Sequence, residues 1–216
     1  MKICRECGTP CADDTVFCYV CGTKFHMNRI TFDRGFVSEQ FATSPDNMSV
    51  VLDSPAILLT DKDISNIYDI LPLLEEVVKN GRQILIIANS FDKEIIDTLL
   101  VNKLRGALAC AAVMAPGLGD RKEQLKDIAI LTGGQVISSD AGLELPNATL
   151  ALCGQAKTVR ITKDETLILC GNGNEANIIE RISQLKSLRL TLQSDYEKKR
   201  IQSRLTNLFG LTDEEI

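Results

Sequence analysis

Short apolar runs alternate with longer amphipathic segments along most of the chain, beginning near residue 55. Short apolar runs between turn signals are typical of buried strands, and apolar repeats of three and four residues are typical of helices. We expect strands at 56–59, 84–88, 108–113, 135–137, 158–161 and 167–170, and helices at 63–79, 93–104, 121–132 and 177–193, with a last helix starting near Ser194. This alternation predicts an α/β domain with buried strands and flanking helices.

Turn and capping residues agree with the expected helix ends. Gly81 and Gly106 stand where two helices should end, and glycine readily takes the left-handed conformation found there. Ser194 and Glu197 have the spacing of a capping box, so they mark the start of the last helix.

Two of the expected helices have more apolar surface than packing against one sheet requires. Between Ile64 and Val78 the apolar positions span about half of the helix circumference, whereas a core-facing stripe needs about 100°. The apolar positions between Ile95 and Leu104 cover an even wider arc. Either both helices are buried on two sides, or an exposed apolar groove between them binds extended or helical apolar segments.

Composition places the chain among ordinary globular proteins. Its 216 residues are 44% hydrophobic and 25% charged, enough for one domain with a small appendage, and this excludes global disorder. No apolar run approaches the roughly 18 residues of a membrane span, and the N-terminus lacks the apolar region of a secretory signal. A net charge of −5 argues against a nucleic-acid-binding surface. We therefore expect a cytoplasmic protein.

Five of the eight cysteines fall within the first 21 residues, which indicates a metal site in a reducing compartment. Cys4 and Cys7 form one Cys-x-x-Cys-Gly knuckle, and Cys18 and Cys21 form another after ten residues. Two such knuckles provide four thiolates for a closed tetrahedral site, which is structural rather than catalytic, and zinc is the metal expected. This unit resembles the small zinc ribbons of many prokaryotic proteins.

The remaining cysteines and the single histidine are not expected to bind the metal. Cys11 and His26 are expected to be bystanders, because four thiolates already complete the site. The charged side chains of the ribbon balance one another, so a tethering or protein-contact role is favoured over nucleic-acid binding. Cys110, Cys153 and Cys170 are expected to be small buried residues.

Several motifs occur in a fixed order from about residue 30 to residue 209. They are Phe32-Asp33-Arg34-Gly35-Phe36 with Phe41, then 54–59, Ile64-Ser65-Asn66-Ile67 leading to Leu71-Pro72, 115–121, 131–134, 154–157 and Ser194-Asp195-Tyr196. In sequence and order they resemble the apical domain of group I (GroEL-type) chaperonins.

This resemblance implies a polypeptide-binding groove between the two helices rich in apolar residues. Carried over by position, its lining would be Phe36, Phe41, Leu71, Leu74, Ile96, Leu100 and Val101. Gln40 stands where the family usually has an aromatic residue, which makes the rim more polar. In the family, the mobile loop of a co-chaperonin uses the same groove.

The cysteine spacing and this resemblance together predict three parts. They are a Cys4 zinc ribbon at 1–27, a chaperonin apical-like polypeptide-binding domain at 28–193, and a C-terminal helix at 194–216 resembling the start of the intermediate domain. The ATP-binding equatorial domain has no counterpart, so we expect no ATPase and no enzyme. The predicted function is ATP-independent, chaperone-like binding of non-native or extended polypeptides. The alternatives are an adaptor that binds one folded partner, such as a chaperonin or co-chaperonin loop, and a structural relic whose groove is covered.

One segment is compatible with a nucleotide site. Gly171-Asn172-Gly173-Asn174-Glu175-Ala176 follows an expected strand and matches a dinucleotide fingerprint. The fingerprint also needs a second strand with an acidic residue at its end, but Asp195 lies in a turn between helices, and Glu175 places negative charge near the phosphates. We expect no bound nucleotide, and no nucleophile–base pair indicates a hydrolase.

Overall fold

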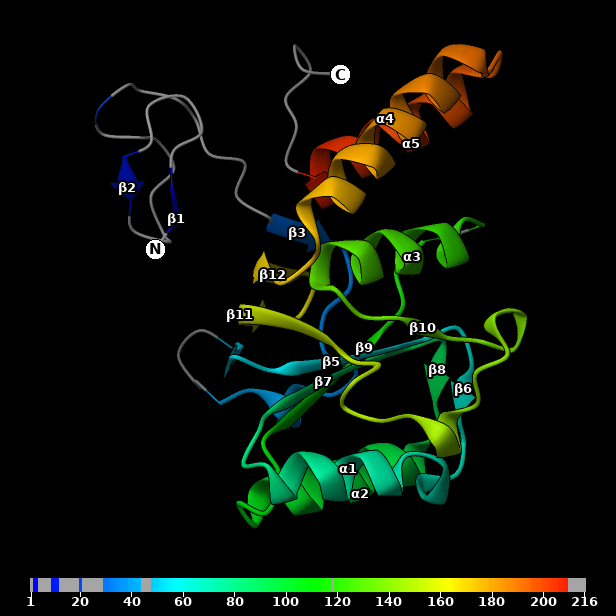
Figure 1. The fold of residues 1–216 in the computed structure, drawn as a ribbon. Coiled ribbons are helices and arrows are strands. Elements are labelled where there is room, and N and C mark those ends of the chain that lie inside the picture. The colour runs from blue at the N-terminus through cyan, green and yellow to red at the C-terminus, as the bar shows by residue number, and fades with distance from the viewer. Residues whose placement is uncertain are drawn as a thin grey trace.

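The computed structural model describes residues 2–3, 9–11, 20, 29–43, 48–117 and 119–209. Near the N-terminus, β1 (Lys2–Ile3) pairs antiparallel with β2 (Pro10–Cys11). These strands flank the segment that contains Cys4 and Cys7 in the sequence. The rest of the described chain is an α/β unit built on a mixed sheet (Figure 1).

The sheet has eight strands in the described part of the chain. The order is β3-β12-β11-β5-β7-β9, with β4 also pairing with β11 and β10 with β5. The strands are β3 (Arg29–Phe32), β4 (Val50–Asp53), β5 (Ala56–Thr60), β7 (Ile84–Ala88), β9 (Cys110–Met114), β10 (Val136–Ile137), β11 (Gly154–Ile161) and β12 (Thr166–Gly171). β10, β5, β7 and β9 are parallel and the remaining pairs are antiparallel. The predicted α/β class with flanking helices is confirmed.

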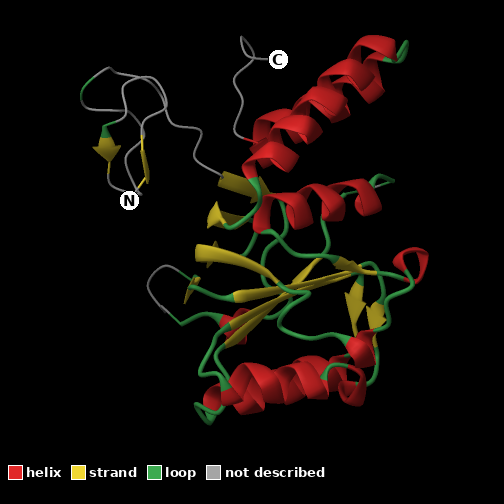
Figure 2. Ribbon diagram, in the orientation of Figure 1, coloured by secondary structure: helices red, strands yellow, loops and turns green. Residues whose placement is uncertain are grey.

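Helices cover both faces of the sheet, as Figure 2 shows by secondary structure. They are α1 (Leu71–Lys79), α2 (Lys93–Leu104), α3 (Arg121–Thr132), α4 (Glu175–Thr191) and α5 (Asp195–Phe209). The chain passes from β5 through α1 to β7, and through α2 to β9, so right-handed crossovers place α1 and α2 on one face. After β9 the chain returns to β10 beside β5, which places α3 on the opposite face, where α4 and α5 stack above it (Figure 1).

The expected helix at 63–79 is wrong over its first eight residues. Asp63–Ile64 form β6, which pairs in parallel with β8 (Ser90–Phe91), and Ile67–Asp69 form the 3-10 turn η2. The Asn66 side chain accepts a hydrogen bond from the Tyr68 amide and so caps η2. The helix α1 begins only at Leu71, with Pro72 in its first turn, where proline is well tolerated. Strands β3 and β4 were not predicted. The helix ends are confirmed, since Gly81 and Gly106 both have positive φ just after their helices.

A buried ion cluster joins α3 to α4 and α5. The fully buried Asp127 carboxylate accepts hydrogen bonds from Arg181 Nε at 2.7 Å and from Arg204 Nε at 2.8 Å. Both arginines also pair with Glu123. Ile201 and Leu205 of α5 are buried in the same core. These contacts cross the predicted boundary between residues 193 and 194.

Candidate functional site

The segments that precede α1 and α2 contact each other. β6 leads into α1 and β8 into α2, and the two short strands pair with each other. Asp63 Oδ1 accepts hydrogen bonds from the Asn89 side chain and from Ser90 Oγ, the latter at 2.6 Å. These bonds hold the pKa of the Asp63 carboxyl below its usual value. These contacts therefore join the segment before α1 to the segment before α2.

The two helices expose a strip of apolar side chains. Of the predicted lining residues, Val101 is 44% exposed, Leu71 and Ile96 are half-buried, and Leu74 and Leu100 are buried. Further exposed side chains lie on or beside the same helices and were not predicted to line the groove: Tyr68, Val78 and Leu104. We define the apolar strip as Tyr68, Leu71, Val78, Ile96, Val101 and Leu104.

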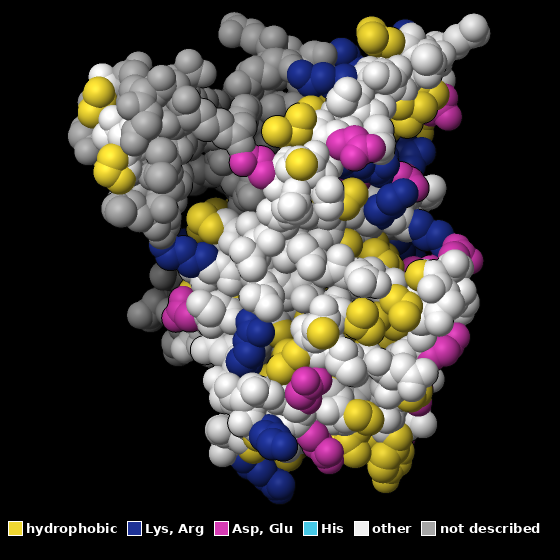
Figure 3. Space-filling view, in the orientation of Figure 1, with side chains coloured by type: hydrophobic (Ala, Val, Ile, Leu, Met, Phe, Trp, Pro, Cys, Tyr) yellow, Lys and Arg dark blue, Asp and Glu magenta, His cyan; other side chains and the backbone are white. Residues whose placement is uncertain are grey.

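Helical spacing is the sequence signal that could have identified the missed residues. Val78 lies four residues after Leu74, and Leu104, which is 76% exposed, lies three residues after Val101. In Figure 3, hydrophobic side chains gather at the lower right, over the end of the molecule where α1 begins.

Phe36 and Phe41, which were predicted to line the groove, do not contribute their rings to this surface. Phe36 is buried and forms an antiparallel bridge with Val113 of β9. Phe41 ends the 3-10 turn η1 (Glu39–Phe41) and is 0% exposed. Glu39 and Gln40 are exposed instead. In this conformation the segment presents polar side chains to solvent, while both rings belong to the core.

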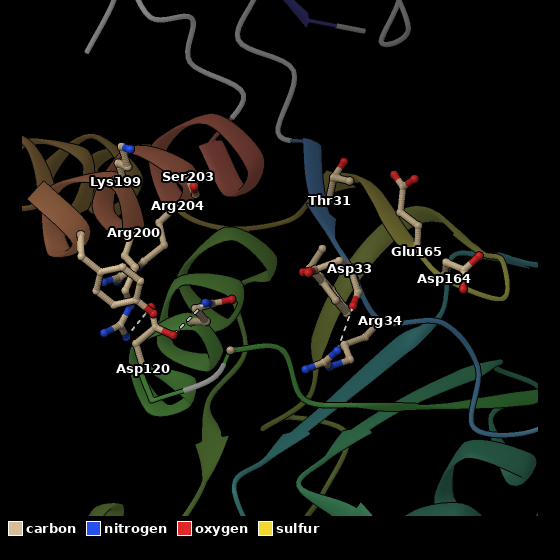
Figure 4. Close-up of a pocket in the computed structure, with 14 residues that line it drawn as sticks. Thr31, Asp33, Arg34, Asp120, Asp164, Glu165, Lys199, Arg200, Ser203 and Arg204 are labelled. Carbon is tan, nitrogen blue, oxygen red and sulfur yellow. Dashed lines mark hydrogen bonds and ion pairs between the residues drawn. The ribbon is translucent and has the colours of Figure 1, made fainter.

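A second surface feature is a cleft of about 810 Å³ between α5 and the β3 edge of the sheet (Figure 4). Its α5 wall carries Lys199 and Arg200, and Arg200 pairs with Asp120 at 3.2 Å. Its other wall carries the acidic side chains Asp33, Asp164 and Glu165, with Arg34 among them. Within the described residues, no ion pair joins Lys199 or Arg200 to these three acids. No sequence pattern indicated this cleft, because its walls come from segments that are far apart in the sequence, around residues 31–34, 117–124, 164–165 and 196–204.

The glycine loop before α4 packs against the end of α3. A Cβ atom at Gly173 would overlap the Ile130 carbonyl oxygen, which explains a glycine at that position. The Gly173 amide donates to the Leu131 carbonyl at 3.0 Å. The Asn174 side chain accepts from the amides of Ala176 and Asn177 at the start of α4. Amides that could bind a phosphate thus donate within the protein, and the absence of a nucleotide stays a prediction.

The carboxyl ends of the parallel strands are a second place where α/β sheets bind ligands, at the point where the strand order reverses. Here that point lies between β5 and β10. The charged side chains nearby pair with each other: Lys62 with Glu144, and Lys122 with Asp140. These groups are engaged in ion pairs on the protein surface.

The predicted zinc ligands Cys4, Cys7, Cys18 and Cys21 lie outside the described residues, as does His26. In the part of the chain that is described, no group of three or more His, Cys, Asp or Glu side chains could hold a metal. Cys110 and Cys153 are buried as expected, and burial raises their thiol pKa values to about 11 and about 12. Cys170 is half-buried.

Comparison with the sequence models of known protein families finds no match to this chain. Among the described helices, none is long and apolar enough to cross a membrane.

Proposed function

We propose that this protein binds non-native or extended polypeptides, without ATP, through the apolar strip on α1 and α2. The observation that carries the proposal is the exposure of Val78, Val101 and Leu104 on two adjacent crossover helices. The resemblance of residues 30–209 to chaperonin apical domains implies a groove between the same two helices, and three of its positions, Leu71, Ile96 and Val101, belong to the strip. A structural zinc ribbon at residues 1–27 would tether the protein or contact a partner.

The expected affinity is modest. An apolar contact of about 300–500 Å² is worth on the order of 8–12 kcal/mol at about 25 cal/mol/Å². The loss of translational freedom and the ordering of the client offset most of this gain. A dissociation constant in the micromolar range, roughly −8 kcal/mol, is therefore the reasonable expectation.

Charge substitutions in the strip test this function. The assay is aggregation of a chemically denatured client without ATP, for the wild type and for Val101→Glu/Leu104→Glu. The matched control is Ile179→Glu/Leu190→Glu, which places the same charges on exposed apolar positions of α4. We expect the wild type and the control to suppress aggregation and the strip variant to fail, with circular dichroism showing that all three are folded. Equal suppression by the strip variant would refute the proposal.

The cleft beside α5 favours a second candidate function, that of an adaptor for one folded partner. Its walls carry opposite charges, and such a surface suits a partner with complementary charges rather than a range of unfolded chains. In that case a single partner would bind saturably, and Lys199→Glu would weaken its binding without affecting the aggregation assay. Lys199 is exposed and lies on the cleft wall, so this change should leave folding intact.

A further inference from the structure

Lys103 lies on α2 between Val101 and Leu104 of the apolar strip, and its side chain is half-buried. Its ammonium group donates a hydrogen bond to the backbone carbonyl of Phe41. The same group lies 5.6 Å from the centroid of the Phe41 ring, within cation–π range. Burial lowers the pKa of this lysine. Its long side chain thus joins α2 to η1, a segment about 60 residues earlier.

Backbone hydrogen bonds complete the closed arrangement of residues 38–43. The Phe41 amide donates to the Ser38 carbonyl at 3.1 Å and the Ala42 amide to Glu39 at 3.0 Å. The Thr43 amide donates to the Ser49 carbonyl at 3.0 Å. In addition to the burial of its ring in the core, Phe41 is joined to α2 by the contact that Lys103 makes. The exposed side chains of the segment are then Glu39, Gln40 and Thr43.

We propose that Lys103 is a specificity-determining residue of the polypeptide-binding surface, because it pins η1 and so keeps the Phe41 ring out of the apolar strip. The effect on clients rests on the proposed function, whereas the pinning of η1 does not. While Lys103 holds η1 closed, Val101 and Leu104 form an aliphatic surface bordered by the polar side chains of residues 39–43. Opening of η1 would add an aromatic side chain next to α2, and clients rich in apolar residues would bind more tightly.

The size of the effect follows from the two interactions that the ammonium group makes. A hydrogen bond from a charged donor together with a cation–π interaction corresponds to roughly 10- to 100-fold in the opening equilibrium. Burial of the large Phe41 ring still favours the closed form without the ammonium group. A variant that lacks this group should therefore stay folded and closed on average, but it should open more often.

Hydrogen exchange of the segment 38–43 tests the pin directly. Lys103→Met keeps the aliphatic part of the side chain and removes its ammonium group. Exchange of the Phe41, Ala42 and Thr43 amides should become about 10- to 100-fold faster. Lys79→Met, at an exposed lysine of α1, is the matched control and should leave these rates unchanged, and Lys103→Arg should restore much of the protection. Unchanged exchange rates of these amides in Lys103→Met would show that Lys103 does not hold η1 closed.

Measurements of client binding test the proposed specificity role of Lys103. Affinity for a denatured client or an apolar peptide should rise several-fold in Lys103→Met, and the added change Phe41→Ala should abolish that gain. If the wild type binds clients and Lys103→Met binds them equally well, the specificity role is wrong even where exchange is faster. If no variant binds any client, the proposed function fails and the specificity role with it, while the exchange rates still decide whether Lys103 pins η1.

Discussion

Replacing Asp127 by Asn should strongly destabilise the folded chain. The carboxylate is fully buried and binds both Arg181 and Arg204, whose side chains are themselves more than nine-tenths buried. Asn preserves the volume but removes the negative charge. Breaking a buried ion pair by removing one partner costs about 3–5 kcal/mol, because the charge that remains is uncompensated. Glu123 still pairs with both arginines, so we expect a loss near the lower value, about 3 kcal/mol.

Urea unfolding followed by far-UV circular dichroism, together with calorimetry, measures this loss. For a domain of this size, 1 kcal/mol shifts the melting temperature by about 2–4 °C, so a fall of about 6–12 °C is expected. Asp140→Asn is the matched control. Asp140 pairs with Lys122, but both side chains are exposed, and such surface pairs contribute about 0–1 kcal/mol.

A second variant separates the loss of charge balance from other effects. The triple variant Asp127→Asn/Arg181→Met/Arg204→Met removes the charges of all three groups. It should therefore recover part of the stability lost in Asp127→Asn. The reasoning is refuted if Asp127→Asn loses less than about 1 kcal/mol, which is the value of a surface pair. It is also refuted if the triple variant is no more stable than the single one.

Three further predictions concern local features. Cys110 and Cys153, with pKa values of about 11 and about 12, should resist thiol reagents at pH 8 until the protein unfolds, as mass mapping of labelled peptides would show. The lowered pKa of Asp63 implies a stabilisation that is present above the usual aspartate pKa and lost as the pH falls through the folded value; the stability difference between wild type and Asp63→Asn should therefore shrink in acid, and a difference constant with pH would contradict this. Gly173→Ala should cost about 1–3 kcal/mol through its clash with Ile130, more than Gly142→Ala, which has a positive φ but open space around it; equal losses in urea unfolding would argue against the clash.

Local patterns were sufficient to predict much of the α/β unit. The ends of α1 and α2 follow from Gly81 and Gly106, because a left-handed residue ends a helix whatever surrounds it. The central strands β5 and β7 were predicted because both faces of a parallel strand are buried, which requires a continuous apolar run. The first eight residues of the expected helix at 63–79 were predicted wrongly for the opposite reason, because the pairing of β6 with β8 depends on a segment about 27 residues away.

The direction in which apolar side chains point was decided only by the tertiary structure. The sequence places Phe41 and Val101 equally among apolar candidates, but folding buries the first and exposes the second. A wide apolar arc on a helix cannot distinguish burial between two layers from exposure, because both need the same residue types.

By itself, then, the sequence determined the alternation of central strands and helices from β5 onward, the positions where α1 and α2 end, and the paired cysteine knuckles expected to bind zinc, all of which depend on residues close together in the chain. Tertiary structure alone decided which residues form the apolar strip, that Lys103 reaches Phe41, and that Asp127 meets Arg204 from 77 residues away. Such long-range contacts are set by how the layers pack, and packing depends on the whole chain at once.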